Sequence, residues 1–375
     1  MKKSTALIPL FEKFIKDCET GKRLKKNGER MKQESIDNFT YTLRNLQSFS
    51  EQASFELRIC DASKLNTREM KSEKNYWKKF YHQFTEYLYK KGLFDNYVGV
   101  TIKNIRTFFN YLQGEKDLDV GDFHKSFYVR QEEIDIHVLS PEQLKYLIHD
   151  KAFEASLSIP LKRTKEMFVF GCTTGLRFSD LQLLNSQNFV KEKGEWYLKI
   201  KSKKTKTNSS FKLPEYAMEI VKPYLKRNSK KTIFTDISLY NFNKNIKKVG
   251  KLAGFTKPVE ITRERQGKAK NINPGKQKNQ VFYEIMSSHM MRRTAITTYL
   301  ILGMPEHLVK KISGHSFNSK SFGRYVHYAQ AFVDQEIDKV HARLSEYWEF
   351  GCWTTYFRQY KFQLSSLELL AKRYK

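Results

Sequence analysis

The sequence predicts a mainly α-helical protein with a small antiparallel β-sheet in its second half. Apolar residues recur at helical spacing through roughly the first 130 residues, and this periodicity is lost in the stretch DLDVGDFHKSFYVRQEEIDIHV. Further on, the stretch EWYLKIKSKKTKTNSSFKLP alternates between apolar and polar residues, as a half-buried strand does. A chain of 375 residues with 40% hydrophobic and 14% aromatic content is long enough for two cores.

Residues 1–130 are predicted to form a helical domain of four helices joined by polar turns. The runs that predict them are LIPLFEKFIKDC, SIDNFTYTLRNLQSF, NYWKKFYHQFTEYLYKKG and VGVTIKNIRTFFNYLQGEK. Gly92 and Gly114 each follow an apolar-periodic run. Because glycine readily adopts the left-handed conformation that ends a helix, both are predicted to be C-caps.

A linker over residues 131–139 is predicted to lead into a second domain over residues 140–340. Ser140 followed by Pro141 is a typical helix start.

The apolar run EMFVFGCTTGLRFSDLQLL predicts a helix that Gly175 interrupts. Ser179 and Asp180 are expected to open the helix that follows. Arg177 then falls in the turn between the two helices, where a long side chain can reach away from the core.

The alternating stretch predicts a β-hairpin. Trp196, Leu198 and Ile200 alternate with polar neighbours, and Phe211 and Leu213 continue the pattern after a polar turn. The far end of this hairpin is almost entirely lysine, serine, threonine and asparagine. Such a tip either keeps the protein soluble or contacts phosphate.

The charge balance points to a polyanionic partner. Lysine and arginine number 68 against 40 aspartate and glutamate, which gives a formal net charge of +28 and a pI near 9.7. Nucleic acid is the expected partner, and a membrane surface is the lesser alternative. The sequence contains no apolar run long enough to span a bilayer, and the start MKKSTALIPLFEKF is not typical of a signal peptide.

The four cysteines do not form a CxxC pair. The sequence therefore predicts neither a disulfide framework nor a zinc knuckle, and this cysteine usage fits a reducing cytoplasm.

Histidine and arginine lie close together in the segment HMMRRTAITTYL. Ser287 or Ser288 is expected to cap a helix, so that His289 and Arg292, three residues apart, share one face beside its N-terminus. The unpaired amides of a helix N-terminus favour an anion, so this face could hold a phosphate.

A second histidine and a tyrosine follow in order. The segment GMPEHLVKKISGH predicts a short helix that Pro305 opens and Gly314 closes, leaving His315 at its exit. The run SKSFGRYVHY predicts a further helix that carries Tyr325.

Arginine, lysine, histidine and tyrosine together suit cleavage of a phosphodiester without water or metal. A tyrosine hydroxyl can attack phosphorus and keep the bond energy in a covalent intermediate. Two arginines can hold the non-bridging oxygens, and histidines and a lysine can donate hydrogen bonds and protons. The sequence offers no carboxylate cluster suited to two-metal catalysis.

These residues, in this order, resemble the tyrosine recombinases, the family of phage integrases, Xer-type resolvases and mobile-element integrases. TTGLRFSDL resembles the first arginine box, HMMRRT the His-x-x-Arg box, and SGHSFNSKSFGRY the Gly-His box followed by the nucleophile. The resemblance covers roughly residues 138 to 340. It implies a catalytic domain of tyrosine recombinase fold, preceded by a helical, SAM-like core-binding domain.

The resemblance also implies a role for each site residue. Arg177 and Arg292 would hold the scissile phosphate, His289 and His315 would assist proton transfer and phosphate binding, and Tyr325 would attack. Asp180 matches the acidic position that supports the first arginine, although it can equally well complement the helix dipole.

Two positions depart from the family pattern. The ninth residue after the Gly-His histidine is usually the tyrosine, but here the ninth is Arg324 and the tenth is Tyr325, with Tyr328 as the alternative nucleophile. One inserted residue in the loop SFNSKS would account for this spacing. KKTKT contains two Lys-Thr pairs, and the spacing back from the strand-ending Leu-Pro pair assigns the lysine to Lys206, with Lys204 as the alternative.

The resemblance implies site-specific DNA recombination by integration, excision or inversion, through a 3′-phosphotyrosyl intermediate and a Holliday junction. It implies no metal and no cofactor. The partners would be double-stranded DNA and three further copies of the chain, in a tetramer on two recombination sites, with accessory DNA-bending or directionality factors as a further option. Such a protein would be cytoplasmic and associated with the nucleoid.

Two alternatives share part of this pattern. A type IB topoisomerase uses the same chemistry to relax DNA, and a DNA-binding protein can retain the fold after losing catalysis. The sequence leaves the target site and the direction of the reaction open, and also whether the N-terminus binds separate arm sites.

The tail over residues 341–375 is rich in aromatic residues and leucine, so it is expected to pack against protein. Two arrangements are open. The segment LSSLELLAKRY could dock on a neighbouring protomer, or the tail could complete the core of its own chain.

Overall fold

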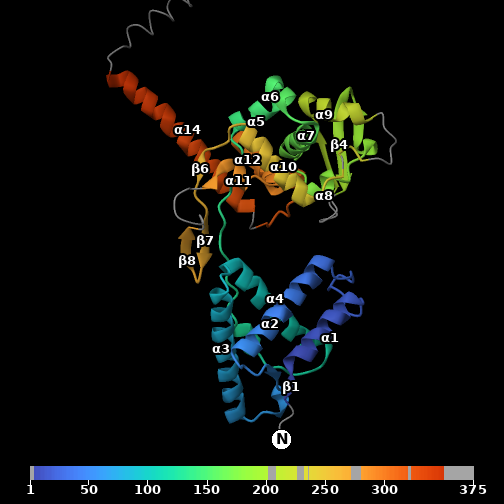
Figure 1. Cartoon of the computed structure of the whole chain (residues 1–375), viewed down its shortest axis with the longest axis vertical. Coiled ribbons are helices and arrows are strands. Elements are labelled where there is room, and N and C mark those ends of the chain that lie inside the picture. Colours follow the sequence, from blue (N-terminus) through green and yellow to red (C-terminus); the bar gives the residue numbers. More distant parts are fainter. Residues whose placement is uncertain are drawn as a thin grey trace, which may run out of the picture. The chain divides into compact units, whose positions relative to one another are not determined.

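The computed structural model describes residues 4–201, 208–225, 232–234, 236–271, 280–319 and 322–349. It divides into two compact units. The first comprises Met1–Asp135 with Glu260–Lys278, and the second comprises Ile136–Val259 with Asn279–Lys375. The described chain is mainly helical with small antiparallel sheets, which confirms the predicted fold class (Figure 1).

The first unit is built on the four predicted helices. They are α1 (Leu7–Glu19), α2 (Gln33–Gln52), α3 (Thr67–Lys90) and α4 (Asp95–Glu115). Short elements complete the first stretch of chain: β1 (Thr5–Ala6) pairs with β2 (Arg58–Ile59), and the 3-10 helices are η1 (Ala62–Lys64) and η2 (Phe123–Ser126).

Aromatic side chains fill the core of this unit. Phe11 and Phe14 on α1 pack against Phe108 on α4, and the rings of Phe80 and Phe84 on α3 stack with centroids 5.3 Å apart. All five side chains are fully buried. Burial of this much aromatic area is the main term that stabilises the bundle.

The two predicted glycine C-caps differ in outcome. Gly92 follows α3 with φ +88°, and its amide donates to the Tyr89 carbonyl at 3.0 Å, so this prediction is confirmed. The prediction for Gly114 is wrong because α4 continues through it to Glu115. Asp117 adopts the left-handed conformation instead, with φ 52°, and aspartate is one of the few other residues that tolerate it.

A second hairpin, which the sequence did not predict, belongs to the first unit although it lies far along the chain. Strands β7 (Thr262–Arg265) and β8 (Lys268–Asn271) are antiparallel. Gln266 and Gly267 form the two-residue turn between them, both at positive φ. That combination matches the right-handed twist of a hairpin.

The second unit contains the remaining helices. They are α5 (Pro141–His149), α6 (Lys151–Ser156), α7 (Ile159–Thr174), α8 (Phe178–Leu181), η3 (Ser186–Asn188), α9 (Glu215–Leu225), α10 (Leu239–Leu252), α11 (Phe282–Ile285), α12 (Ser288–Ile301), α13 (Glu306–Ser313) and α14 (Gly323–Glu349). Its strands are β3 (Phe189–Glu192), β4 (Glu195–Lys201), β5 (Asn208–Lys212), and the pair β6 (Pro258–Val259) and β9 (Gln280–Val281).

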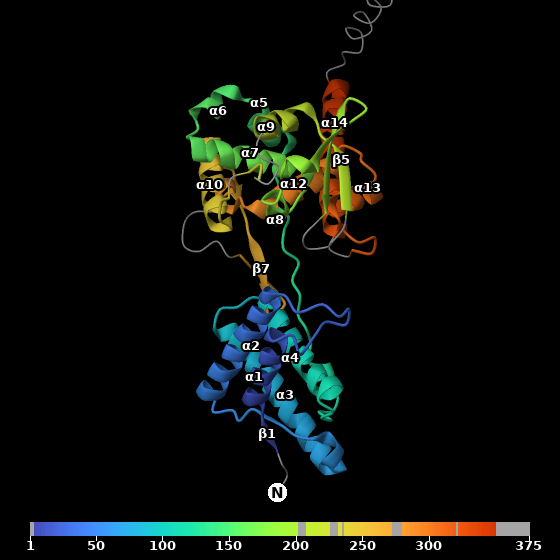
Figure 2. The same ribbon diagram turned by 90° about the vertical axis from the view of Figure 1, so that its right-hand side faces the viewer.

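Helix α7 is the centre of the second unit, where α5, α9, α10 and α12 pack against it (Figure 2). Its last two turns are apolar or small and are buried on every side. This explains the continuous apolar run in the sequence, which is typical of a helix with no solvent-facing stripe.

The predicted β4–β5 hairpin is confirmed, with Leu198 opposite Phe211. Strand β3 pairs with the other edge of β4 and makes a three-stranded sheet, and β5 also contacts α13. The sequence did not indicate β3, because four residues are too few to establish an alternation.

Three predicted helix ends in this unit can be compared with the structure. Ser140 forms a capping box with Gln143, and Gly175 ends α7 with φ +66°, as expected. The predicted start at Ser179 and Asp180 is wrong. The amide of Asp180 donates to the carbonyl of Arg177 at 2.9 Å, so Arg177 is itself the N-cap and α8 begins at Phe178.

Helix α14 runs without a break through Glu349, so the beginning of the predicted tail continues this helix. Residues 350–375, including LSSLELLAKRY, lie outside the described residues. Among the helices that the structure describes, none combines the length and the apolar character needed to cross a membrane.

Candidate active site

The turn between α7 and α8 presents the first arginine. Gly175 reverses the chain in the left-handed conformation, and Arg177 follows as a half-buried N-cap. Asp180 lies in the first turn of α8 and is 2% exposed. Both groups act on the charge of Arg292, since Arg177 lowers and Asp180 raises its pKa. The Gly175 carbonyl of this turn accepts a hydrogen bond from Arg292 at 3.0 Å, so the turn itself lies beside the second arginine.

Helix α12 supplies a histidine and that second arginine. It begins at Ser288 with Ser287 as N-cap, as predicted, but without a side-chain cap hydrogen bond. His289 is exposed, whereas Arg292, one turn later, is buried. Its guanidinium donates to the Gly175 carbonyl at 3.0 Å and to the Ser313 carbonyl. Arg292 thus ties the ends of α7 and α13 to α12.

His315 leaves the end of α13, as the sequence predicts. Gly314 ends the helix with φ 60°, and the amide of His315 donates to the Lys310 carbonyl at 2.9 Å. The imidazole Nδ1 lies 2.8 Å from Ser313 Oγ and 3.3 Å from Arg292 Nη2. These contacts fix the ring beside the buried arginine.

Tyr325 lies near the start of α14 and is 6% exposed. Its ring centroid is 6.0 Å from that of His315 and 5.9 Å from that of Phe322. It belongs to a small core cluster with Ile296 of α12 and Val309 of α13. Packing of α14 on these two helices therefore places the tyrosine beside His315.

Tyr328, the alternative nucleophile, lies about one turn further along α14. It is half-buried, and burial raises its pKa. Among the described residues, Tyr325 makes the ring contact with His315 and belongs to the core cluster of Ile296, Val309 and Phe322, whereas Tyr328 is not a member of that cluster.

The electrostatics of the cluster disfavour further positive charge. Burial and the neighbouring Arg177 lower the pKa of Arg292 to about 10. Burial, together with Arg292, Arg177, Lys310 and His289, lowers the pKa of His315 to about 4. His315 is therefore neutral at physiological pH, while Arg292 keeps its charge. The arrangement can bind an anion and exchange a proton through a neutral imidazole.

Two polar residues at the cluster were missed by the sequence analysis. Ser313 Oγ lies 2.8 Å from the His315 imidazole, and the Lys310 ammonium helps to lower the pKa of His315. Ser313 and Lys310 precede the Gly-His pair by one residue and about one helical turn, so a helix ending at Gly314 could have indicated them.

The lysine candidates Lys204 and Lys206 lie outside the described residues. Within the described ranges, no group of three or more histidine, cysteine, aspartate or glutamate side chains is placed to hold a metal ion.

Comparison with known proteins gives a consistent result. The sequence profile of the Phage integrase family matches residues 137–331, which is just over half of the chain. No curated protein matches.

Several solved structures share the fold. They include a lambda integrase dimer bound to a COC′ core site (11% identity, 86% of this chain and 78% of that chain covered, TM-score 0.56), the XerH site-specific recombinase bound to palindromic difH substrate in a post-cleavage complex (15%, 87% and 84%, 0.56), and the Tn1549 transposon integrase in complex with transposon right end DNA (14%, 88% and 99%, 0.52).

The profile match includes all five described candidates for the reaction, from Arg177 to Tyr325. They come from segments far apart in the sequence, and the contacts of Arg292 with Gly175 and His315, and of His315 with Tyr325, bring the ends of α7, α12, α13 and α14 together. The chain therefore belongs to the phage integrase family and is an enzyme of the tyrosine recombinase type.

Proposed function

We propose that the protein is a site-specific DNA recombinase that cuts and rejoins DNA through a covalent 3′-phosphotyrosyl intermediate and a Holliday junction. The observation that carries this proposal is the cluster of Arg292, His315 and Tyr325. Arg292 donates to His315, and the ring of His315 lies 6.0 Å from the ring of Tyr325.

In the proposed first step, the Tyr325 hydroxyl oxygen attacks the phosphorus of the scissile phosphodiester. A bond forms between this oxygen and phosphorus, and the bond from phosphorus to the 5′ oxygen breaks. The 3′ phosphate stays on the enzyme, and the 5′ oxygen leaves as a hydroxyl after gaining a proton. Attack by the 5′ hydroxyl of a partner strand reverses the step and reseals DNA without an external energy source.

The two arginines are assigned to the phosphate. Charge grows on the non-bridging oxygens in the transition state, and the fixed guanidinium forks of Arg177 and Arg292 suit those oxygens. Asp180, buried next to this pair, is assigned the support of the first arginine. The contacts of Arg292 to two backbone carbonyls hold it in place before substrate arrives.

Proton transfer is assigned to His289, His315 and a lysine. His315 is neutral near pH 7, so it can accept the tyrosine proton or donate a hydrogen bond. The resemblance assigns the proton for the leaving 5′ oxygen to Lys206, with Lys204 as the alternative. No metal or cofactor enters this mechanism.

Partners follow from the same proposal. The lambda integrase, XerH and Tn1549 integrase structures above each contain DNA, and a further one is described as a lambda integrase tetramer bound to a Holliday junction. For this chain we propose binding to double-stranded DNA, which its charge of +28 favours, and assembly as a tetramer on two sites. The tail after residue 340 remains a candidate for docking on a neighbouring protomer or in its own chain.

A nicked suicide substrate tests the proposal. A DNA carrying a candidate recombination site is nicked next to the scissile phosphate, so that the short 5′-hydroxyl fragment diffuses away after cleavage. The expected result is a covalent protein–DNA band that survives denaturation and forms in the presence of EDTA. Binding without this band would favour a catalytically silent DNA-binding protein. Relaxation of supercoiled plasmid without paired sites and without exchange would favour a topoisomerase.

A further inference from the structure

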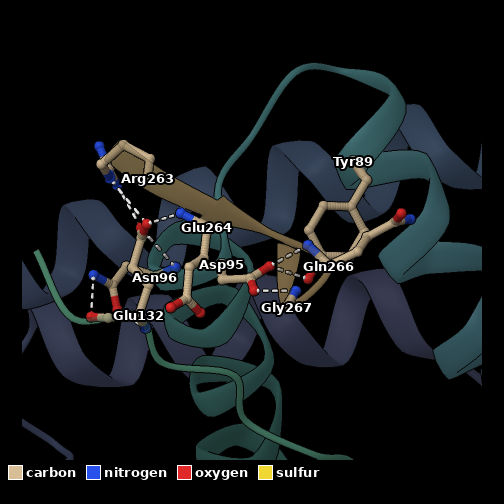
Figure 3. A network of polar contacts seen from close by, with 8 residues as sticks. All are labelled: Tyr89, Asp95, Asn96, Glu132, Arg263, Glu264, Gln266 and Gly267. Atoms are coloured by element: carbon tan, nitrogen blue, oxygen red, sulfur yellow. Dashed lines mark hydrogen bonds and ion pairs between the residues drawn. The ribbon is translucent and has the colours of Figure 1, made fainter. Parts of the chain in front are cut away.

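A buried aspartate of the first unit binds the turn of the β7–β8 hairpin. Asp95 accepts hydrogen bonds from the backbone amides of Gln266 at 2.8 Å and Gly267 at 2.7 Å (Figure 3). It also accepts one from the Tyr89 hydroxyl at 2.6 Å. Asp95 is only 1% exposed. Two of the three donors to its buried carboxylate come from a segment at least 171 residues away in the sequence.

A second buried carboxylate binds the first strand of the hairpin. Glu132 accepts from Arg263 at 3.0 and 2.6 Å and from the amide of Glu264 at 2.6 Å (Figure 3). The amide of Asn96 adds a bond of 3.3 Å. The Glu132 side chain is fully buried, and the Arg263 guanidinium also lies 4.7 Å from the ring centroid of Phe94.

Both carboxylates are stabilised as anions by these contacts. Burial acts to raise the pKa of Asp95 and of Glu132, but the hydrogen-bond donors outweigh burial, so each pKa lies below its ordinary value. A buried carboxylate that loses its donors is strongly unfavourable. Most donors of Asp95 and Glu132 belong to the hairpin, so an undocked hairpin would leave two buried charges poorly compensated.

The path of the chain gives this docking a further consequence. The chain leaves the first unit after Asp135, returns at Glu260, and leaves again after Lys278. The linker after Asp135 is a covalent connection between the units, and the docked hairpin is a second, non-covalent one. Glu132 lies three residues before Asp135, where the chain first leaves the first unit, and it forms an ion pair with Arg263 of the returning segment. This ion pair joins the start of the linker to the hairpin.

We propose that the β7–β8 hairpin is a latch, held by Asp95 and Glu132, that restrains how far the two units of the chain can separate. When the hairpin is docked, the units are connected twice. When it is released, the linker alone connects them. The inference rests on the proposed function in one respect, since a recombinase must admit and release a DNA duplex, and a releasable connection permits that.

Hydrogen–deuterium exchange of the full-length protein without DNA tests whether the two carboxylates hold the hairpin. The double variant Asp95→Asn, Glu132→Gln weakens the charge-assisted bonds to the amides of Glu264, Gln266 and Gly267. Peptides covering residues 260–271 should then exchange roughly tenfold to a hundredfold faster than in the wild type, as expected for loss of such bonds.

Asp17→Asn is the matched control. Asp17 is also a buried aspartate of the first unit that accepts from a tyrosine, Tyr111, at 2.6 Å, but its other partner is Lys116 rather than the hairpin. It should leave exchange in residues 260–271 within about twofold of the wild type. Unchanged exchange in the double variant, or an equal increase in Asp17→Asn, would show that these carboxylates do not hold the hairpin.

Electron spin resonance distances test the restraint itself. Spin labels introduced as unnatural amino acids at the exposed positions Asp37 on α2 and Lys145 on α5 report the separation of the two units in the full chain. The double variant should give a broader and longer distance distribution than the wild type, and Asp17→Asn should match the wild type. Faster exchange of the hairpin with an unchanged distribution would overturn the latch.

A variant made in the hairpin guards against loss of the helical fold. Gly267→Pro removes one amide donor and cannot adopt φ +73°, yet it changes no residue of α1–α4. It should reproduce the broader distribution while peptides of α1–α4 keep wild-type exchange. These measurements contain no DNA, so a failure of the latch is separate from a failure to form the covalent DNA complex.

Discussion

Two regions of the molecule contain buried ionisable groups with lowered pKa values. One is the hairpin anchor of the first unit, which consists of Asp95, Glu132 and their donors on the β7–β8 hairpin, and the other is the candidate site of the second unit. The lowered pKa values have opposite meanings in the two regions. For Asp95 and Glu132 a lower pKa means that the neighbours stabilise the charged form. For Arg292 and His315 a lower pKa means that burial and neighbouring cations oppose the charged form. In the anchor, hydrogen-bond donors compensate the negative charges of the carboxylates, whereas the candidate site brings several positive groups together.

This difference shows which of the two regions has unfavourable charge–charge interactions in the folded protein. Hydrogen-bond donors surround the carboxylates of the anchor, so their negative charges are compensated while the hairpin is docked. Arg292 is fixed by the carbonyls of Gly175 and Ser313, which orient the guanidinium without neutralising it. A phosphate at the site would offset the excess charge, and the charge that develops on its oxygens during cleavage would offset more of it.

The largest expected effect comes from removing the proposed nucleophile. Tyr325→Phe should lower formation of the covalent complex on a suicide substrate by at least about a thousandfold, because the attacking oxygen is lost. DNA binding should be unchanged, since no charge is removed. The measurement is a denaturing gel of protein–DNA adducts beside a binding assay.

Tyr328→Phe is the matched control, one turn along the same helix. It should retain covalent complex formation within a fewfold of the wild type. Adducts that persist in Tyr325→Phe and vanish in Tyr328→Phe would exchange the roles of the two tyrosines.

The next effect distinguishes a guanidinium fork from a simple positive charge. Arg292→Lys keeps one charge but loses the geometry that reaches two carbonyls and, in the proposed mechanism, a phosphate as well. Single-turnover cleavage should fall by about a hundredfold, in the range seen when one transition-state donor is removed. Arg263→Lys, at the anchor, should leave the same rate within a fewfold. Equal losses in both variants would mean that the site arginine acts through stability alone.

The opposite meanings of the pKa shifts predict different pH dependence. Folded His315 has a pKa near 4 against an ordinary value near 6.5, so between these limits the unfolded chain binds more protons and stability falls as pH falls. The fall in the free energy of unfolding across this pH range should be smaller in His315→Gln than in the wild type by about 1–2 kcal/mol. This figure is reduced to allow for solvent at the half-buried ring.

The anchor should behave differently in the same window. Its carboxylates have lowered pKa values, so their contribution is fully present above the unfolded pKa near 4 and is lost only as pH falls through the folded values. Unfolding temperatures measured at pH 7 and pH 5 check this comparison. An Asp95→Asn variant whose deficit disappears already at pH 5 would contradict it.

The site was more predictable from sequence than the anchor. Arg177, His289, Arg292, His315 and Tyr325 lie in short segments whose turns and caps are local features. Gly175 and Gly314 adopt the left-handed conformations that the sequence indicates, and these turns aim the arginine and the histidine. The local sequence therefore indicated where the candidate site residues lie along the chain. Packing of α14 on α12 and α13 places Tyr325 beside His315.

The anchor depends on pairing that no local pattern encodes. Glu132 and Arg263 are 131 residues apart, and β8 is exposed at all four positions, so it shows no apolar alternation. Glu132 lies in a stretch without regular structure, where a carboxylate normally faces solvent. Only the folded chain shows that it is buried against the returning hairpin.

Two glycines of the helical unit give the smallest and most sharply matched effects. A Cβ added at Gly92 or at Gly114 meets no atom within 4 Å, so steric contact distinguishes neither site. The backbone does distinguish them, since Gly92 has φ +88° and Gly114 lies within the regular helix α4.

Gly92→Ala should lower the free energy of unfolding by about 1 kcal/mol, because an L-residue with a Cβ is strained at positive φ. Gly114→Ala should raise it by about 0.5–1 kcal/mol through helix propensity. Urea denaturation followed by circular dichroism measures both. Opposite signs are required if helix α4, and not a glycine cap, occupies residue 114, and destabilisation by both variants would restore Gly114 as the end of the helix.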